Sequence, residues 1–167
     1  IQSRTKNRFL GLRQTLGHSY SWNELMTANS ILVIPYNIST MSLFEMATAG
    51  LPIIVPSRSF LKALRLEYDG VLSELSFFEI RKLDTIGFTP DNPNNFRSSE
   101  YLDWWLDRAD FFNSDLMPNV TVIESFEELK FMRGEYPRAP QQARTMEHNS
   151  LLFRSREEKY LKFLQKI

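Results

Sequence analysis

Residues 31–57, ILVIPYNISTMSLFEMATAGLPIIVPS, predict a strand, a polar loop, a helix and a second strand in close succession. The run at 31–35 is apolar throughout, as expected for a strand that is buried on both faces of a parallel sheet. Residues 41–49 carry apolar side chains at helical spacing, and a second short apolar strand follows at 52–55. Because parallel strands need a crossover helix between them, this stretch predicts a right-handed β-α-β unit.

The ends of the predicted helix carry recognisable signals. Asn37, Ser39 and Thr40 precede it, and these residue types form turns and cap helices. Gly50 stands where a helix commonly ends in a left-handed residue, a conformation that favours glycine. Pro56 closes the second strand. The sequence therefore predicts where this helix begins and where it ends.

The rest of the chain continues to alternate helices with strands. The other expected elements are a helix or loop within 1–18, a helix at 21–28 opened by a capping box of Ser21 and Glu24, helices at 57–68 and within 70–83, a loop at 89–99, a helix at 100–111, a strand at 119–123, a helix at 125–132 with a second capping box, and an amphipathic helix within 141–167 that packs on the domain. This alternation indicates an α/β fold, namely a Rossmann-like three-layer domain with a short parallel sheet.

The composition is that of one globular domain. The chain has 167 residues, of which 43% are hydrophobic and 24% charged, so we expect a single domain over 1–167. It starts at Ile1 in a basic stretch without a preceding strand, and we expect it to be part of a longer chain. A net charge of +0 gives no field that would attract nucleic acid. Because no apolar run approaches the ~20 residues of a membrane span and no secretory segment opens the chain, we expect a cytoplasmic protein without a transmembrane segment.

The residue types that are missing exclude several kinds of chemistry. The chain has no cysteine, which excludes disulfides, thiolate catalysis and cysteine-ligated zinc. His18 and His148 are far apart in the sequence, so a histidine-rich metal site is excluded, and we interpret both as surface or hydrogen-bonded residues. Glycosylation sequons at Asn37 and Asn119 adjoin predicted strands, and we interpret them as chance matches.

The loop at 36–40 lies where α/β sheets bind ligands, beyond the carboxyl end of a strand. The helix that follows offers unpaired N–H groups and a partial positive charge, which favour a phosphate, and Ser39, Thr40 and Ser42 add hydroxyl donors. One turn further, the carboxylate of Glu45 can accept hydrogen bonds from two ribose hydroxyls. Simpler interpretations stay open, because serine and threonine often only cap a helix and a helical glutamate is usually a solvated surface residue.

Residues 37–52, NISTMSLFEMATAGLP, resemble the nucleotide-sugar motif of the GT-B glycosyltransferases. In that family the C-terminal domain carries two glutamates eight residues apart, followed by a helix of small residues and a Gly-x-Pro exit. Glu45 matches the second glutamate and residues 50–52 match the exit, while Asn37 stands at the position of the first glutamate. The resemblance implies that Glu45 binds the ribose and that the backbone of 40–42 binds the diphosphate.

The resemblance further implies a fold and an activity. The chain would be half of a GT-B fold, the donor domain of a glycosyltransferase that transfers a sugar from a UDP- or GDP-sugar to an unknown acceptor. An acceptor-binding domain would lie upstream. Enzymes of this family typically work without a bound metal, and we expect no cofactor. No catalytic residue is assigned. The expected nucleotide-sugar-binding residues are Tyr20, Tyr36, Asn37, Ser39, Thr40, Met41, Ser42 and Glu45.

Asn37 departs from the family pattern. The first glutamate is often linked to the donor sugar, so its replacement leaves open which sugar is bound and whether the reaction inverts or retains the anomeric configuration. Two alternatives remain beside the transferase. One is a nucleotide-sugar epimerase of the same fold, and the other is a non-enzymatic α/β module that assembles through an exposed surface such as the C-terminal helix.

Two further groups of residues are weaker candidates for a site. Trp104 and Trp105 stand among aspartates, as in a sugar-binding platform, but adjacent tryptophans on a helix point to different faces, and we favour packing between elements. The basic residues within 4–13 either face a diphosphate or form a disordered lead-in to the domain, and we favour the lead-in.

Overall fold

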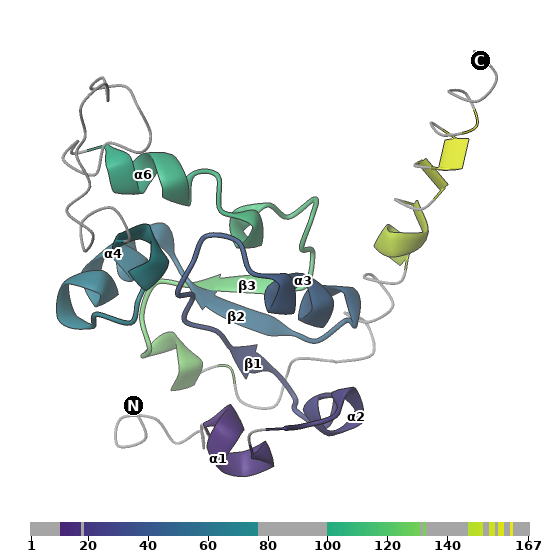
Figure 1. Ribbon diagram of the computed structural model, residues 1–167, viewed down its shortest axis with the longest axis horizontal. Helices are drawn as coiled ribbons and strands as arrows, with labels where there is room; N and C mark the ends of the chain where they lie inside the picture. The colour runs from purple at the N-terminus through teal and green to yellow at the C-terminus, as the bar shows by residue number, and fades with distance from the viewer. Residues whose placement is uncertain are drawn as a thin grey trace.

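The computed structural model describes residues 11–17, 19–76, 100–130 and 132, and, near the C-terminus, 147–151, 154–155, 157–158 and 161. Figure 1 shows its elements, which are α1 (Leu12–Leu16), α2 (Trp22–Leu25), β1 (Ile31–Leu32), α3 (Met41–Thr48), β2 (Ile53–Pro56), α4 (Arg58–Glu67), η1 (Ser73–Ser76), α6 (Tyr101–Leu106), η2 (Asp110–Phe112), β3 (Val120–Ile123) and η3 (Glu128–Lys130). The expected loop at 89–99 lies outside the described residues, as do Arg4, Lys6, Arg8, His18 and Asp91.

Three parallel strands form one open sheet in the order β1-β2-β3. β2 lies in the centre, with Ile31 opposite Ile53 on one side and Ile53 opposite Val120 on the other. Every residue of β2 is buried, which accounts for its uninterrupted apolar sequence. β1 is shorter than predicted, although Val33 N still donates to Ile54 O at 2.9 Å. The three predicted strands and the mixed α/β class are confirmed.

α3 ends in a Schellman motif at Gly50. This glycine has φ 76°, its N–H donates to Ala47 O at 2.9 Å, and Leu51 N donates to Met46 O at 3.1 Å. Leu51 and Met46 both belong to the buried core, so the apolar residues that usually accompany this motif are present. The cap predicted at Gly50 is confirmed, and it turns the chain directly into β2.

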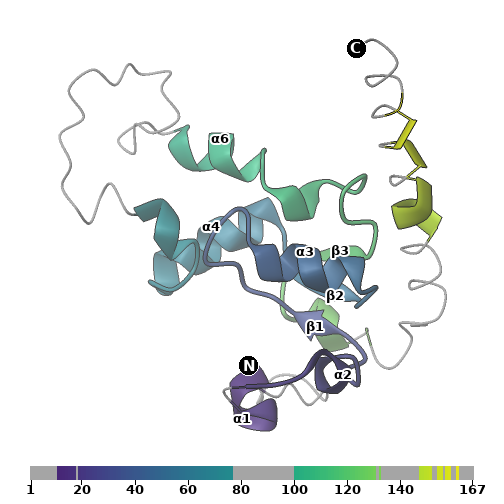
Figure 2. The ribbon, with the colours of Figure 1, turned by 45° about the vertical axis from the view of Figure 1, so that its right-hand side comes forward.

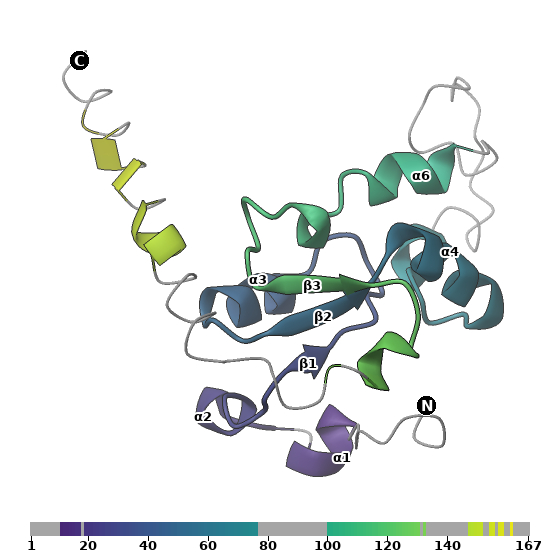
Figure 3. The ribbon, with the colours of Figure 1, turned by 180° about the vertical axis from the view of Figure 1, so that it is seen from behind.

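Figures 1 and 3 show α3 over one face of the sheet, α4 beyond the carboxyl ends of the strands, and α6 beside β3. The core on this face surrounds Ile53 and Val55 of β2 and contains Leu43, Leu61 and Leu106 from the three helices. The strands follow one another in the same direction across the sheet, and right-handed crossovers then place their connecting helices on the same side. The order of the strands therefore explains why all three helices contribute to one core cluster.

The opposite face of the sheet carries a smaller cluster. Ile54, Ile123 and Leu129 are buried there, with Phe126 partly buried against them. Figure 3 shows this face from behind, and no α-helix among the described residues lies over it. The second helical layer that a three-layer domain requires is thus not among the residues that the structure describes.

The helix predicted at 100–111 is interrupted. α6 ends at Leu106, and Ala109 has extended dihedrals (φ −66°, ψ 127°) before η2 begins. This break turns Phe111, which is 2% exposed, into the core. A continuous helix was therefore the wrong prediction, because burial of Phe111 requires the chain to change direction after Leu106.

Two other predicted helices form only short 3-10 turns within the described residues. The helix expected at 125–132 is η3, where Glu128 Oε1 accepts from Glu124 N at 2.8 Å and from Ser125 N at 3.1 Å. The acidic half of the predicted capping box is present, but the turn that it stabilises is not extended into an α-helix. Within 70–83, the described residues form turns and then η1, and residues 77–83 lie outside the described part.

All described residues from 147 to 161 are helical, and the first continuous stretch is 147–151. Figures 1 and 2 show this helix extending away from the sheet. Leu151 is 59% exposed and Leu161 51% exposed, and Asn149 Nδ2 donates to Thr48 O at 3.3 Å. The predicted helix is confirmed in part, but these two leucines do not pack on the domain. No described helix combines the length and the apolar composition of a membrane span.

Candidate functional site

The loop that leaves β1 is tied down by a strap, residues 72–74. Leu72 N donates to Pro35 O at 2.9 Å, and Glu74 N donates to the carbonyl of the next residue, Tyr36, at 3.1 Å. The side chains add a further bond, because Asn37 Nδ2 donates to Glu74 Oε2 at 2.6 Å. The carboxyl end of β1 is therefore held from a distant part of the chain.

The N-terminus of α3 lacks a side-chain cap. Thr40 occupies the N-cap position with extended dihedrals (φ −135°, ψ 132°), and its hydroxyl makes no capping hydrogen bond. Leu43 N donates to the backbone carbonyl of Thr40 at 3.1 Å, whereas the N–H groups of Met41 and Ser42 make no hydrogen bond among the described residues and are left for another acceptor. Thr40 itself is only 8% exposed, whereas Ser39 and Ser42 are exposed. The hydroxyls of Ser39 and Ser42 are thus the ones that a ligand would reach.

A groove of about 450 Å³ runs along the exposed side of α3. Its lining residues are Trp22 of α2 and Met41, Phe44, Glu45, Thr48 and Ala49 at the end of α3 or on it. The α3 residues repeat at intervals of three and four, which places them on one face of the helix. Trp22 is 47% exposed and Met41 74% exposed, so the groove is an apolar surface open to solvent.

Glu45 is the charged residue of this groove. Its side chain is exposed, and its carboxylate makes no hydrogen bond or ion pair with any residue that the structure describes. Met41 precedes it by one turn, or about 6 Å of helix rise. The groove therefore joins a carboxylate without a described partner, aromatic and apolar side chains, and the uncapped end of α3.

Comparisons with protein-family models, with curated proteins and with solved structures found no match.

The predicted site residues do not all converge. Met41 and Glu45 line the groove, while Asn37 contacts Glu74 beside the loop. Tyr20 and Tyr36 are 41% and 48% exposed, and neither lines the groove. Tyr36 belongs to the loop after β1, where its carbonyl accepts from Glu74 N. Tyr20 lies neither in that loop nor in the groove.

Sequence reasoning missed Trp22 and Glu74. Trp22 lies inside the capping box of α2, in which Ser21 Oγ accepts from Glu24 N at 3.3 Å and Glu24 Oε2 accepts from Ser21 N at 2.7 Å. An aromatic residue exposed at the first position of a short helix was the available signal. Glu74 had no local signal, because its relation to Asn37 spans 37 residues.

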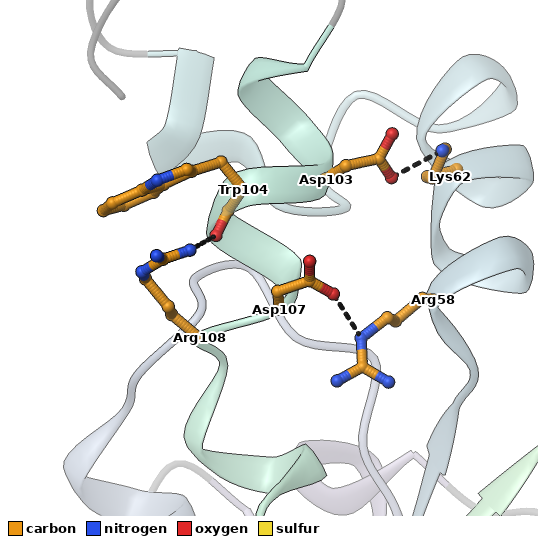
Figure 4. Close-up of polar contacts among 6 residues, drawn as sticks. All are labelled: Arg58, Lys62, Asp103, Trp104, Asp107 and Arg108. Atoms are coloured by element: carbon orange, nitrogen blue, oxygen red, sulfur yellow. Dashed lines mark hydrogen bonds and ion pairs between the residues drawn. The ribbon is translucent and has the colours of Figure 1, made fainter. Parts of the chain in front are cut away.

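The aspartates beside Trp104 serve packing between α4 and α6 (Figure 4). Lys62 Nζ lies 2.6 Å from Asp103 Oδ1, and Arg58 Nε lies 3.3 Å from Asp107 Oδ1. Asp103 and Asp107, two carboxylates of the sugar-binding platform considered above, thus form ion pairs with cations of α4.

Trp104 and Trp105 also contact other side chains of the protein. The Arg108 guanidinium lies 3.7 Å from the Trp104 ring centroid, and Trp104 meets Trp105 edge to face with centroids 4.8 Å apart. Trp105 packs against the core. Packing between elements is thus observed for Trp105, whereas the contacts of Trp104 lie within α6 and the residues that directly follow it.

A second polar cluster lies beyond the carboxyl ends of β2 and β3. Glu124 Oε2 accepts from Ser57 Oγ at 2.6 Å and from Ser59 Oγ at 2.9 Å, and Ser57 Oγ also accepts from Phe60 N at 3.1 Å as the cap of α4. The hydrogen bond from Ser57, and then that from Ser59, lowers the pKa of the Glu124 carboxyl. The serine hydroxyls are thus committed to Glu124, and the cluster joins α4 to the end of β3.

Proposed function

We propose that this chain is the donor domain of a GT-B-like glycosyltransferase and that it binds a nucleoside diphosphate sugar along α3. The diphosphate lies at the N-terminus of the helix, where the N–H groups after Thr40 and the hydroxyls of Ser39 and Ser42 donate hydrogen bonds. Glu45 accepts hydrogen bonds from the ribose hydroxyls. The base lies in the apolar part of the groove, between Trp22 and Phe44.

The observation that carries this proposal is the position of Glu45. Its carboxylate has no partner among the described residues, and it lies within an apolar groove one turn from an uncapped helix end. A carboxylate repels phosphate but accepts hydrogen bonds from vicinal hydroxyls, so it suits the ribose rather than the diphosphate. The ~6 Å rise between Met41 and Glu45 is comparable to the separation of ribose and phosphates in one nucleotide.

The same geometry supports a transfer reaction. Negative charge increases on the diphosphate as the bond to the sugar breaks, and the positive end of α3 stabilises that charge. The acceptor and the catalytic base would come from a partner domain. Because an epimerase needs the same stabilisation, the product formed from a nucleotide sugar distinguishes the two activities.

Thermal-shift and ligand-observed NMR titrations with UDP, GDP, ADP and CMP test the proposal. We expect one diphosphate to stabilise the chain and CMP, which has a single phosphate, to bind less well. Glu45→Gln should lower the affinity for that diphosphate about tenfold, because the amide carries no charge and has one oxygen instead of two to accept the ribose hydroxyls. Glu67→Gln is the matched control, since Glu67 is an exposed glutamate at the end of α4. If none of the four nucleotides binds to the folded chain, the proposal is wrong.

The C-terminal helix favours a second candidate function, that of a non-enzymatic interaction module. Leu151 and Leu161 are each more than half exposed, and the helix extends away from the sheet. Sedimentation over a range of protein concentrations tests this alternative. Self-association that is lost in Leu151→Lys, together with no response to nucleotides, would favour the module over the transferase.

A further inference from the structure

Met41 is the most exposed methionine among the residues that the structure describes. It is 74% exposed, whereas Met46 is 9% exposed and Met117 2% exposed. Met26 and Met132 are partly buried, and each packs against one of the two core clusters. The sixth methionine of the chain, at position 145, lies outside the described residues. A dissolved oxidant therefore reaches the sulfur of Met41 more easily than that of any other described methionine.

This exposed sulfur belongs to the groove along α3. Met41 is the first residue of the helix, and it lines the groove together with Trp22 and Phe44. A thioether is apolar and polarizable, and it makes favourable contacts with aromatic rings. In the groove, Met41 thus combines an apolar contact surface with a sulfur that is open to solvent.

Oxidation of Met41 would change the groove and leave the core intact. When a thioether reacts with hydrogen peroxide, an S–O bond forms on the sulfur, the O–O bond of the peroxide breaks, and the second oxygen leaves as water. The sulfur is oxidised by two electrons and the peroxide is reduced by two. The product is a polar, chiral sulfoxide. Because Met41 is largely exposed, the core loses no contact, unlike after oxidation of Met46 or Met117.

We propose that Met41 is a peroxide-sensitive modification site and that its oxidation lowers the affinity of the groove for the nucleoside diphosphate. The effect on binding rests on the proposed function, whereas the selective oxidation of Met41 does not. The sulfoxide oxygen carries partial negative charge at the end of α3 where the diphosphate lies, and the side chain no longer offers an apolar contact. A methionine sulfoxide reductase restores the thioether, so the modification is reversible.

Peptide mass spectrometry after brief treatment with hydrogen peroxide tests the selectivity. In the folded chain, we expect Met41 to be oxidised about tenfold faster than Met46 and Met117, because oxidation follows exposure. The matched control is the same chain in urea, where the three methionines should react at similar rates. If Met41 is oxidised no faster than Met46 and Met117 in the folded chain, the inference is wrong.

Titrations with UDP and GDP before and after the peroxide treatment test the effect on binding. We expect oxidation to lower the affinity for the diphosphate that binds about fivefold, because part of an apolar contact is lost. Treatment with a methionine sulfoxide reductase should restore the affinity, and thermal unfolding without ligand reports on the fold. In Met41→Leu, which has no sulfur at this position, peroxide should change the affinity less than about twofold relative to the untreated variant.

The possible failures of the two proposals differ. Selective oxidation of Met41 without a loss of affinity, or an equal loss after peroxide treatment of Met41→Leu, would overturn the regulatory role of Met41 while leaving the proposed function intact. If the untreated wild-type chain binds neither UDP nor GDP, the proposed function and the effect of Met41 on binding are both wrong.

Discussion

Asn119 shows how one polar side chain joins three elements. It is 2% exposed, and its Nδ2 donates to Ala47 O of α3 at 3.2 Å and to Leu51 O before β2 at 2.5 Å. Its backbone carbonyl also accepts from Ile53 N at 3.1 Å. Such burial makes this residue unsuitable for glycosylation in the folded chain, in agreement with the interpretation of its sequon as a chance match.

Asn119→Ala should lower the free energy of unfolding by about 3 kcal/mol. The substitution removes the buried side-chain donor of Leu51 O and of Ala47 O, of which Ala47 O keeps the hydrogen bond from Gly50 N, and a buried group left without its partner typically costs about 1–3 kcal/mol. Urea denaturation measures the change. Asn23→Ala is the control, because Asn23 is exposed on α2 and its removal should cost less than about 0.5 kcal/mol. Equal effects of the two substitutions would contradict the joining role of Asn119.

The residues of the candidate site differ in how far the sequence predicts them. Glu45 could be placed on the helix beside the loop, because the relation between residues 40 and 45 is set by helical spacing alone. Trp22 and Glu74 could not be placed in the same way. Their positions depend on how α2 and η1 pack, and packing between segments far apart in the chain leaves no periodic signal in a single sequence.

At the scale of the elements, the sequence predicts where helices begin and end more accurately than whether a helix is continuous. Caps are local, so Ser21, Ser57 and Gly50 could be identified from residue type and spacing. The break after Leu106 is a tertiary effect, because it serves the burial of Phe111. The sequence 100–111 satisfies a helical pattern throughout, and nothing local opposes the continuous helix.

Gly50→Ala should lower the free energy of unfolding by about 1 kcal/mol. Gly50 adopts φ 76° in the Schellman motif of α3, and a side chain disfavours this conformation by roughly 1–2 kcal/mol. Thermal or urea unfolding measures the change. Gly70→Ala is the matched control, since Gly70 has no positive φ and an added Cβ would meet no atom within 4 Å. A stability loss at Gly70 as large as that at Gly50 would contradict this explanation.

At the scale of the whole molecule, the described residues form a well-packed centre and an exposed extension. β2 is buried along its length and pairs with both neighbours, and α3, α4 and α6 contribute side chains to the core cluster that contains it. Asn149 of the C-terminal helix donates a hydrogen bond to Thr48 O at the end of α3, and Leu151 and Leu161 of the same helix are exposed. The candidate site runs along the exposed face of α3 from Met41 to Ala49, so its far end, at Thr48, lies beside the contact with Asn149.

Hydrogen exchange should separate these two parts. The amides of Ile53 and Ser57 are buried and bonded to Asn119 O and Ile123 O, so we expect them to exchange only when much of the domain opens. Amides at 147–151 belong to a largely exposed helix and should exchange on the order of a thousandfold faster, given a global stability of at least about 5 kcal/mol. Exchange at 147–151 that is slow, and that slows further as protein concentration rises, would contradict this expectation. It would show instead that the exposed leucines are covered by a second copy of the chain, as the interaction-module hypothesis requires.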